Sequence, residues 1–212
     1  MRTVLLTGFA PFSSAHVNPS WEAARSVADQ WSGAATVVAE QLPVEFGGAG
    51  DALQAAVDRF SPDIVIALGV AEGRRAFTPE RVAINIDDAR IPDNAGAQPI
   101  DVPIIADAPA GLFSTLPVKT IVRAVRAAGI PSELSNSAGT YVCNHVFFRL
   151  LHALAGTDAR GGFIHVPATA QMRVEHTGPT LEQSAITAGV HIAVETALAH
   201  TTDAVVTEGT VH

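Results

Sequence analysis

The sequence predicts an α/β fold, a single-domain three-layer sandwich with a mostly parallel or mixed central sheet and helices on both faces. Short aliphatic runs alternate with segments of helical periodicity along most of the 212 residues. One run, residues 63–68, is almost continuously aliphatic, which is typical of a strand buried on both faces. Because no internal repeat or composition change marks a boundary, we expect one domain over residues 1–212.

The elements of the first half follow from apolar runs and helix-start signals. Residues 3–7 and 36–42 are rich in β-branched and aliphatic residues, as strands are. Asn18 and Pro19 predict a helix start, with Asn18 as the cap and Pro19 at the first helical position. A second helix is expected over residues 49–60, and another strand over residues 81–86.

The second half begins with an unusual segment. Residues 87–111 contain four prolines and predict a long loop, which in a compact domain is usually functional or disordered. Beyond it, the patterns predict helices over 116–128 and 140–154 and strands over 133–136 and 162–166. Residues 180–183, with the sequence TLEQ, fit a capping box that opens a last helix ending near residue 199. The polar tail, residues 200–212, is expected to be loose.

Composition and charge exclude several classes of protein. The chain has 13 Lys and Arg against 21 Asp and Glu, a net charge of −8, and its basic residues do not cluster. This argues against nucleic-acid binding. No apolar run is long enough to cross a bilayer, so no membrane role is expected. With one cysteine and no signal-peptide pattern, we expect a cytoplasmic protein in which Cys143 is a free thiol.

Cofactor patterns are incomplete. The segment Gly47–Gly50 lacks the third glycine of the dinucleotide fingerprint, and Lys119, the only lysine, does not belong to a phosphate loop. The eight histidines and Cys143 do not show metal-ligand spacing. We therefore expect neither an organic cofactor nor a metal.

Cys143 is the candidate nucleophile. It follows a turn of small residues, 135–140, and opens an apolar helix, where the positive end of the helix dipole would favour a thiolate. Backbone N–H groups there could also bind a developing oxyanion. The alternative is a small structural residue, since free cysteine is among the most buried residue types.

A thiol nucleophile needs a base, and His165 is the best-placed histidine. It stands at the carboxyl end of the strand expected over 162–166, the edge where open α/β sheets place their sites. The alternative is a hydrogen-bonded structural histidine. The other histidines are weaker candidates because they lie in polar or terminal segments (His16, His176, His200 and His212) or on a helix surface or in structural bonds (His145 and His152).

The base is usually oriented by an acidic group. Glu80, Asp87, Asp88 and Asp93 all precede or follow the strand expected over 81–86. Position in the sequence does not choose among these four carboxylates.

Four separated blocks resemble the pyroglutamyl peptidase I (pyrrolidone-carboxylate peptidase) family of cysteine peptidases. They are VLLTGFAPF with VNPSWE, TPERVAINIDDARIPDNAGAQPID, SNSAGTYVCNHVFF and GGFIHVP, in the family's order and over nearly the whole chain. The resemblance implies a triad of Cys143, His165 and Glu80, with Arg90 near the oxyanion. It implies removal of N-terminal pyroglutamate (5-oxoproline) from small peptides through a thioester acyl-enzyme, by a homo-oligomer of two or four chains.

The same resemblance implies the substrate pocket. Pyroglutamate has no charged amine, so a site that binds it needs a flat apolar slot and a few hydrogen bonds. The matched residues are Phe9 and Phe12 at the ring, Asn18 and the backbone of residues 69–71 as polar groups, and Val70, Ile91, Tyr141 and Val142 as walls. The residues alone leave other roles open: core packing for the two phenylalanines, helix capping for Asn18, and a salt bridge to Asp87 or Asp88 for Arg90.

Several loop positions depart from the family pattern. Ala10 stands in place of glutamate, Val70 of glutamine, Glu72 of glycine and Ala168 of tyrosine. Two other functions therefore stay open, a non-catalytic relative that binds pyroglutamyl peptides and a cysteine amidohydrolase of a different cyclic amide. The three triad positions match the family.

Overall fold

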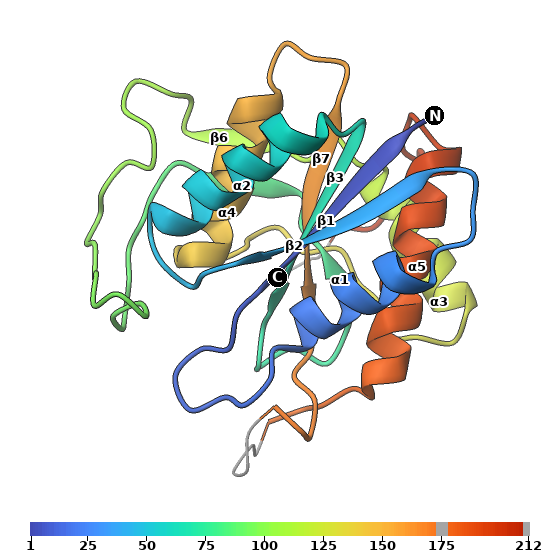
Figure 1. Cartoon of the computed structure of the whole chain (residues 1–212), viewed down its shortest axis with the longest axis horizontal. Helices are drawn as coiled ribbons and strands as arrows, with labels where there is room; N and C mark the ends of the chain where they lie inside the picture. Colours follow the sequence, from blue (N-terminus) through green and yellow to red (C-terminus); the bar gives the residue numbers. More distant parts are fainter. Residues whose placement is uncertain (173–177, 210–212) are drawn as a thin grey trace.

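The computed structural model describes residues 1–172 and 178–209. A five-stranded sheet in the order β2-β1-β3-β7-β4 forms its centre (Figure 1). The parallel strands are β1 (Thr3–Phe9), β2 (Thr36–Leu42), β3 (Ile64–Val70) and β7 (Arg160–Val166). The short β4 (Thr78–Pro79) runs antiparallel to β7 at the edge. The mixed central sheet that the sequence predicts is thus confirmed.

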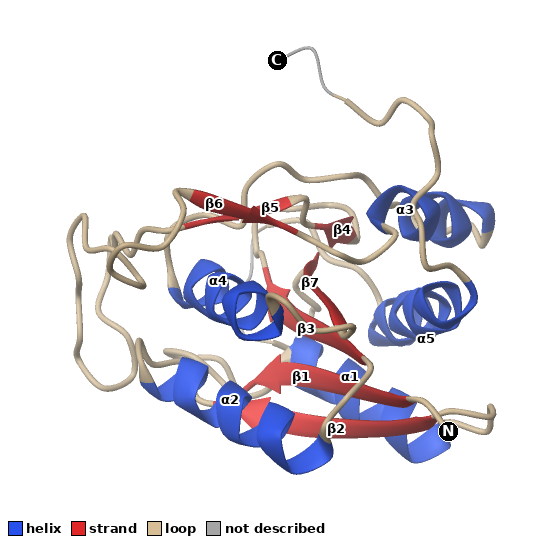
Figure 2. Ribbon diagram, turned by 90° about the horizontal axis from the view of Figure 1, so that it is seen from above, coloured by secondary structure: helices blue, strands red, loops and turns tan. Residues whose placement is uncertain are grey.

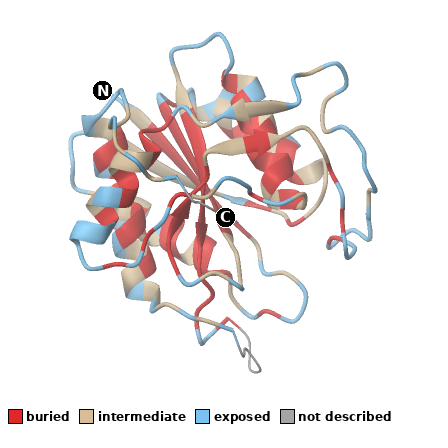
Figure 3. Ribbon diagram, turned by 180° about the vertical axis from the view of Figure 1, so that it is seen from behind, coloured by how far each residue is buried: buried red, intermediate tan, exposed pale blue. Residues whose placement is uncertain are grey.

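Helices cover both faces of this sheet (Figure 2). One face carries α1 (Pro19–Gln30), α3 (Val118–Ala127) and α5 (Gln183–Ala199), and the other carries α2 (Gly48–Phe60) and α4 (Val142–Leu154). In β1, the fully buried Val4 and Leu6 pack on the first face and Leu5 packs on the second. Figure 3 shows the buried residues gathered on the strands and the inner sides of the helices.

Helix starts agree only partly with their sequence signals. α1 begins as predicted, because the side chain of Asn18 accepts a hydrogen bond from the backbone N–H of Ser20 at 3.1 Å. α5 does not begin with the predicted capping box: Glu182 is its N-cap, and its side chain makes no cap hydrogen bond. The physical reason is that Thr180 forms a bridge with Ala168 in the loop after β7, which keeps Thr180 extended ahead of the helix.

Two predicted strands differ from the structure. The strand expected over residues 81–86 is reduced to β5 (Val82–Ile84), which pairs with β6 (Gly111–Phe113) in a separate two-stranded sheet. Residues 133–136 form no strand, because Ser135 makes only an isolated bridge with Glu80. The loop is confirmed, since residues 85–110 contain neither a helix nor a strand.

The tail that was expected to be loose makes polar contacts as far as Glu208. Asp203 accepts hydrogen bonds from the backbone N–H groups of Lys119 and Thr120 at 3.0 and 2.9 Å, at the start of α3. Glu208 forms an ion pair with Arg126 at 2.9 Å. The tail therefore caps α3 from a distant part of the chain. Within residues 1–172 and 178–209, no helix is both long and apolar enough to cross a membrane.

Candidate active site

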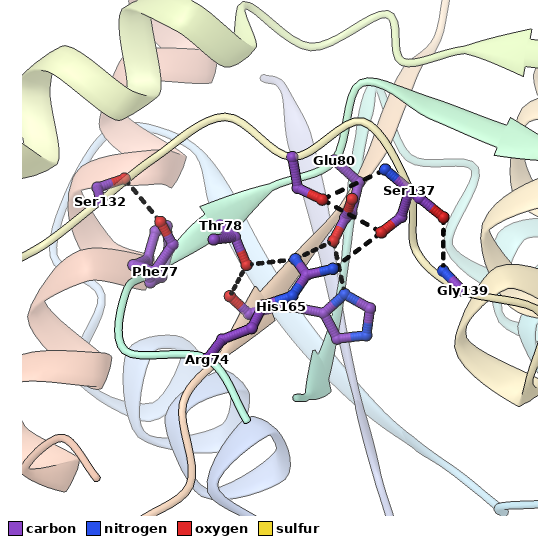
Figure 4. A network of polar contacts seen from close by, with 9 residues as sticks. Arg74, Phe77, Thr78, Glu80, Ser132, Ser137, Gly139 and His165 are labelled. Carbon is purple, nitrogen blue, oxygen red and sulfur yellow. Dashed lines mark hydrogen bonds and ion pairs between the residues drawn. The ribbon is translucent and has the colours of Figure 1, made fainter. Parts of the chain in front are cut away.

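His165 and Glu80 form a buried pair at the edge of the sheet. β4 pairs Thr78 with His165 of β7, and Glu80 lies one residue beyond β4. Nδ1 of His165 lies 2.7 Å from Oε1 of Glu80 (Figure 4). Glu80 is fully buried and His165 is 4% exposed. Because a carboxylate only accepts hydrogen bonds, this contact places the proton of a neutral imidazole on Nδ1 and leaves Nε2 as an acceptor.

The competing aspartates lie elsewhere. Oδ2 of Asp87 is 2.8 Å from Nδ1 of His145, which is buried as well. Asp93 accepts backbone N–H groups, among them that of Phe46 at 2.7 Å. Asp88 is exposed. Among the four carboxylates that the sequence leaves open, Glu80 is therefore the one beside His165.

Arg74 holds Glu80 from a second direction. Its Nη1 donates to Oε1 of Glu80 at 2.5 Å and to Oγ1 of Thr78 at 2.7 Å. Its Nη2 donates to the carbonyl oxygen of Ser137 at 2.8 Å (Figure 4). Sequence reasoning missed this role of Arg74. The role could have been inferred from the chemistry of Glu80, because a fully buried carboxylate needs a cation or several donors beside it.

Cys143 lies in the first turn of α4, whose N-cap is Tyr141. A Cβ built on Gly69, near the end of β3, would lie 2.8 Å from Sγ of Cys143. Gly69 in turn pairs in register with His165 on the neighbouring strand. Because hydrogen-bonded strands lie about 4.8 Å apart, α4 brings the sulfur close to the imidazole across the β3–β7 pair.

Burial opposes ionisation of both groups. Burial raises the pKa of the Cys143 thiol to about 12, the charge of Glu80 adds to this rise, and Arg74 opposes it. This is the opposite of the thiolate that the sequence predicts from the helix dipole. Burial also lowers the pKa of His165, against the raising effect of Glu80 and together with the lowering effect of Arg74. The free protein therefore holds a thiol beside a neutral imidazole at neutral pH.

A cavity of about 540 Å³ opens beside Cys143. Its lining includes every side chain that the sequence assigns to the substrate pocket, and Arg90 as well, but of residues 69–71 only Val70 lines it. The assigned side chains are those of Phe9, Phe12, Asn18, Val70, Ile91, Tyr141 and Val142. His165 and Glu80 do not line the cavity, so Cys143 alone of the predicted triad faces it.

Comparisons with known proteins show the family of this chain. A model of the pyroglutamyl peptidase family matches residues 2–200. The chain belongs to the pyroglutamyl peptidase family. It is 52% identical to a pyrrolidone-carboxylate peptidase of Cupriavidus necator over 207 residues, which cover 96% of both chains. It is 47% identical to one of Erwinia tasmaniensis over 213 residues, which cover 100% of both chains.

Solved structures of the family have the same fold. Pyroglutamyl peptidase I of Bacillus amyloliquefaciens superposes with a TM-score of 0.93 at 43% identity, covering 96% of this chain and 100% of that chain. Pyrrolidone carboxyl peptidase of Thermococcus litoralis superposes with a TM-score of 0.88 at 40% identity, covering 94% of each chain.

In this member of the pyroglutamyl peptidase family, the side chain of Asn18 is hydrogen-bonded, whereas that of Arg90 has no such bond to a described residue. The amide of Asn18 is engaged on both sides: Oδ1 accepts from Ser20, and Nδ2 donates to the carbonyl oxygen of Ala10 at 3.0 Å. It therefore holds the first loop as well as capping α1. Arg90 is exposed and makes no hydrogen bond or ion pair with any described residue. The considered salt bridge to Asp87 does not form, because Asp87 pairs with His145.

Aromatic rings fix the cavity wall. The ring of Tyr141 lies 5.8 Å from that of Phe12 and 5.2 Å from that of Phe46, the latter edge-on. The hydroxyl of Tyr141 donates to the carbonyl oxygen of Pro92 at 2.9 Å. These contacts tie the residue before α4 to both the first loop and the 85–110 loop, so the wall is built before any ligand arrives.

The structure adds lining residues that the sequence did not assign to the pocket. They are Ser13, Val44, Glu72, Asp88, Thr140 and Met172. Met172 packs with Ala168, Val70 and Ala15 in a small apolar cluster. The chain thus has a methionine wall near the position where the family pattern has a tyrosine.

Three of the weaker histidine candidates, His16, His152 and His200, are exposed, whereas His176 and His212 lie outside the described residues. Across the described parts of the chain, no group of three or more His, Cys, Asp or Glu could hold a metal ion.

Proposed function

We propose that this protein is a cysteine peptidase that removes an N-terminal pyroglutamyl residue from peptides through a thioester acyl-enzyme. One observation carries the proposal. Cys143 faces an apolar cavity and lies against Gly69, the register partner of His165, and His165 is held by Glu80. The family membership and the names of the relatives support the substrate class.

In the first step, Cys143 is the nucleophile and His165 is the base. Because Nδ1 of His165 is held by Glu80, Nε2 accepts the proton of the thiol. Sγ bonds to the pyroglutamyl carbonyl carbon, and the π electron pair of the carbonyl moves to its oxygen. The imidazolium that forms is stabilised by the carboxylate of Glu80.

Two kinds of donor meet the resulting oxyanion. The first N–H groups of α4 have no partner within the helix and point toward its N-terminal end. Arg90 lines the same cavity and makes no hydrogen bond or ion pair with any described residue, so its donors are available for the oxyanion. Preorganised donors of this kind typically contribute about 3 kcal/mol each to the stabilisation of the transition state.

The acyl-enzyme then forms and breaks down. The carbon–nitrogen bond breaks, its electron pair goes to the leaving amine, and the imidazolium of His165 gives that amine its proton. Water next adds to the thioester carbon while Nε2 takes a proton from the water. Collapse of this second intermediate breaks the carbon–sulfur bond, the thiolate of Cys143 is reprotonated by His165, and 5-oxoproline leaves.

The cavity suits a lactam ring. Phe9, Phe12 and Tyr141 supply flat apolar walls, and Val70 brings the end of β3 to the same space. Because the lactam N–H is a donor, it needs an acceptor, and we assign its recognition to backbone carbonyl groups of residues 69–71.

A panel of amides tests the substrate class against the two rival functions. Fluorogenic amides of pyroglutamate, of proline and of the six-membered 6-oxopipecolic acid should be compared under reducing conditions. Preferential turnover of the pyroglutamyl amide supports the peptidase. Preferential turnover of the six-membered lactam amide supports a different cyclic-amide hydrolase, and tight binding without turnover supports the non-catalytic relative.

We further propose a homo-oligomer, a dimer or tetramer, in a reducing, cytoplasmic compartment. Two large apolar side chains, Ile100 and Phe113, are 71% and 68% exposed and are the candidates for contact with a second copy. The reducing compartment follows from the need to keep Cys143 as a thiol. Light scattering of the purified protein tests the assembly. A monomer at micromolar concentration would refute it.

A further inference from the structure

Arg74 and His165 share one oxygen of Glu80. Nη1 of Arg74 and Nδ1 of His165 lie 2.5 and 2.7 Å from Oε1. The second oxygen, Oε2, is buried and has no hydrogen-bond partner within residues 1–172 and 178–209. When two donors share one acceptor oxygen, each hydrogen bond is weaker than it would be alone. The strength of the bond between Glu80 and His165 therefore depends on Arg74.

The guanidinium is fixed by two further acceptors. Oγ1 of Thr78 belongs to β4, which pairs with β7 at His165. The carbonyl oxygen of Ser137 belongs to the turn that leads into α4, and the hydroxyl of Ser137 accepts the N–H of Gly139 in the same turn. Figure 4 shows the guanidinium between these segments. Arg74 thus connects Glu80, the strand β4 that pairs with the strand of His165, and the turn before Cys143.

We propose that Arg74 is a positioning residue for the base: it fixes Glu80 through Oε1 and thereby orients His165 to accept the Cys143 proton. The proposal rests on the function proposed above. It assigns to Arg74 a role in the protonation of the site as well as a role as counter-ion to Glu80.

The charges around His165 support this role. Burial lowers the pKa of His165 most, Glu80 from the segment after β4 raises it, and Arg74 from the segment after β3 lowers it further. Cys143 from α4 is an uncharged thiol at neutral pH, and the ring of Phe163, 4.9 Å from that of His165, does not titrate. Arg74 is thus the one cation facing His165 among the described residues, and its removal leaves Glu80 to favour the imidazolium.

Two substitutions at Arg74 separate charge from geometry. Arg74→Gln keeps a donor for Glu80 and removes the charge, whereas Arg74→Lys keeps the charge and loses the two-pronged guanidinium. Arg75→Gln is the matched control, because Arg75 is the adjacent residue, is exposed and does not line the cavity. Thermal unfolding of each variant shows which of them fold.

The first readout is the pH profile of kcat/KM on a pyroglutamyl amide. Arg74→Gln should move the acidic limb to higher pH, because loss of the cation favours the imidazolium. Arg74→Lys should leave that limb in place with a lower rate, and Arg75→Gln should match the wild type. A purely structural counter-ion would lower the rate without moving the limb, and this result would overturn the proposal. If Arg74→Gln does not fold, Thr78→Ala, which loosens the guanidinium, should move the limb in the same direction by less.

The second readout does not depend on turnover. Cys143 is the only cysteine, so the rate of alkylation by iodoacetamide reports on this thiol alone. Because the charge of Arg74 lowers the pKa of Cys143, Arg74→Gln should slow alkylation about tenfold at pH 8. An unchanged rate would contradict the proposed role of the charge. Slower alkylation of Arg74→Gln, combined with a wild type that does not cleave pyroglutamyl amides, would refute the proposed function but support the role of Arg74.

Discussion

The sulfur of Cys143 rests on the backbone of Gly69. A Cβ on Gly69 would lie 2.8 Å from Sγ and 2.8 Å from the ring of Phe163, closer than real Cβ atoms approach either. Because Gly69 is the register partner of His165, this contact sets how the nucleophile faces the base. The glycine is required by this close approach, and its φ angle is not in the left-handed region.

We therefore expect Gly69→Ala to displace the sulfur. The protein should lose about 1–3 kcal/mol of stability through overpacking. Activity on a pyroglutamyl amide should fall about 100-fold, because a misplacement of about 1 Å is costly in catalysis. Gly73→Ala is the control, since a Cβ on Gly73 meets nothing within 4 Å. Equal activity of the two variants would show that the contact at Gly69 is unimportant.

The raised pKa of Cys143 makes a prediction about stability at alkaline pH. The folded value of about 12 lies above the ordinary value of 9.0, so the unfolded chain releases this proton first as the pH rises. The stabilising contribution of the thiol is full below about pH 9 and is lost between about pH 9 and 12, by at most about 1.4 kcal/mol per unit. Urea unfolding of the wild type and of Cys143→Ala at pH 8 and pH 10 measures it. The wild type should lose more stability over this interval than the variant, and parallel losses would contradict the prediction.

The pair of Asp87 and His145 joins the 85–110 loop to α4. Both side chains are buried and contact each other through Oδ2 of Asp87 and Nδ1 of His145. Their second polar atoms, Oδ1 and Nε2, have no hydrogen-bond partner among the described residues. Asp87→Asn should destabilise the protein by about 1–3 kcal/mol. It should also raise KM more than it lowers kcat, because the loop carries Ile91 into the cavity. Asp107→Asn removes the same charge from an exposed position of this loop and should leave the stability, KM and kcat unchanged. A lower kcat at constant KM would argue against a role in binding.

The tail supplies the cap of α3, and Asp203→Ala tests this contact. Loss of the two backbone hydrogen bonds at 3.0 and 2.9 Å should cost about 1 kcal/mol, the usual value of an N-cap. Activity should be unchanged, since Asp203 does not line the cavity. Chemical denaturation of this variant and of Asp158→Ala, an exposed aspartate in the loop after α4, gives the comparison. A stability equal to that of Asp158→Ala would mean that the tail does not hold α3.

The sequence predicts most of the fold because the principal elements have strong local signals. Thr36–Leu42 agrees residue for residue, and α1 starts where Asn18 and Pro19 place it. The failures lie where pairing at a distance decides the structure. Residues 133–136 look like a strand, but Ser135 finds only one bridge partner. Thr180 fits a cap locally, but it bridges to Ala168.

The site residues also divide into those with a local sequence signal and those placed by contacts between distant segments. Cys143 and His165 are visible in the sequence because each sits at the end of a recognisable element. From the residues alone Glu80 could not be separated from three aspartates, since only the antiparallel β4 brings it beside His165. Arg74 was missed because its acceptors come from two segments far apart in the sequence, residues 78–80 and the turn at Ser137. The thiolate expected from the helix dipole is contradicted, because burial raises the pKa of the Cys143 thiol to about 12.

The most direct test of the central claim is hydrolysis of a fluorogenic pyroglutamyl amide under reducing conditions by the wild type and by Cys143→Ala. The wild type should release the amine, and the variant should lose at least about 10⁴-fold in rate, as expected when a nucleophile is removed. Thermal unfolding should show that both proteins are folded. A folded wild type without activity, or a variant that keeps its activity, would contradict the account.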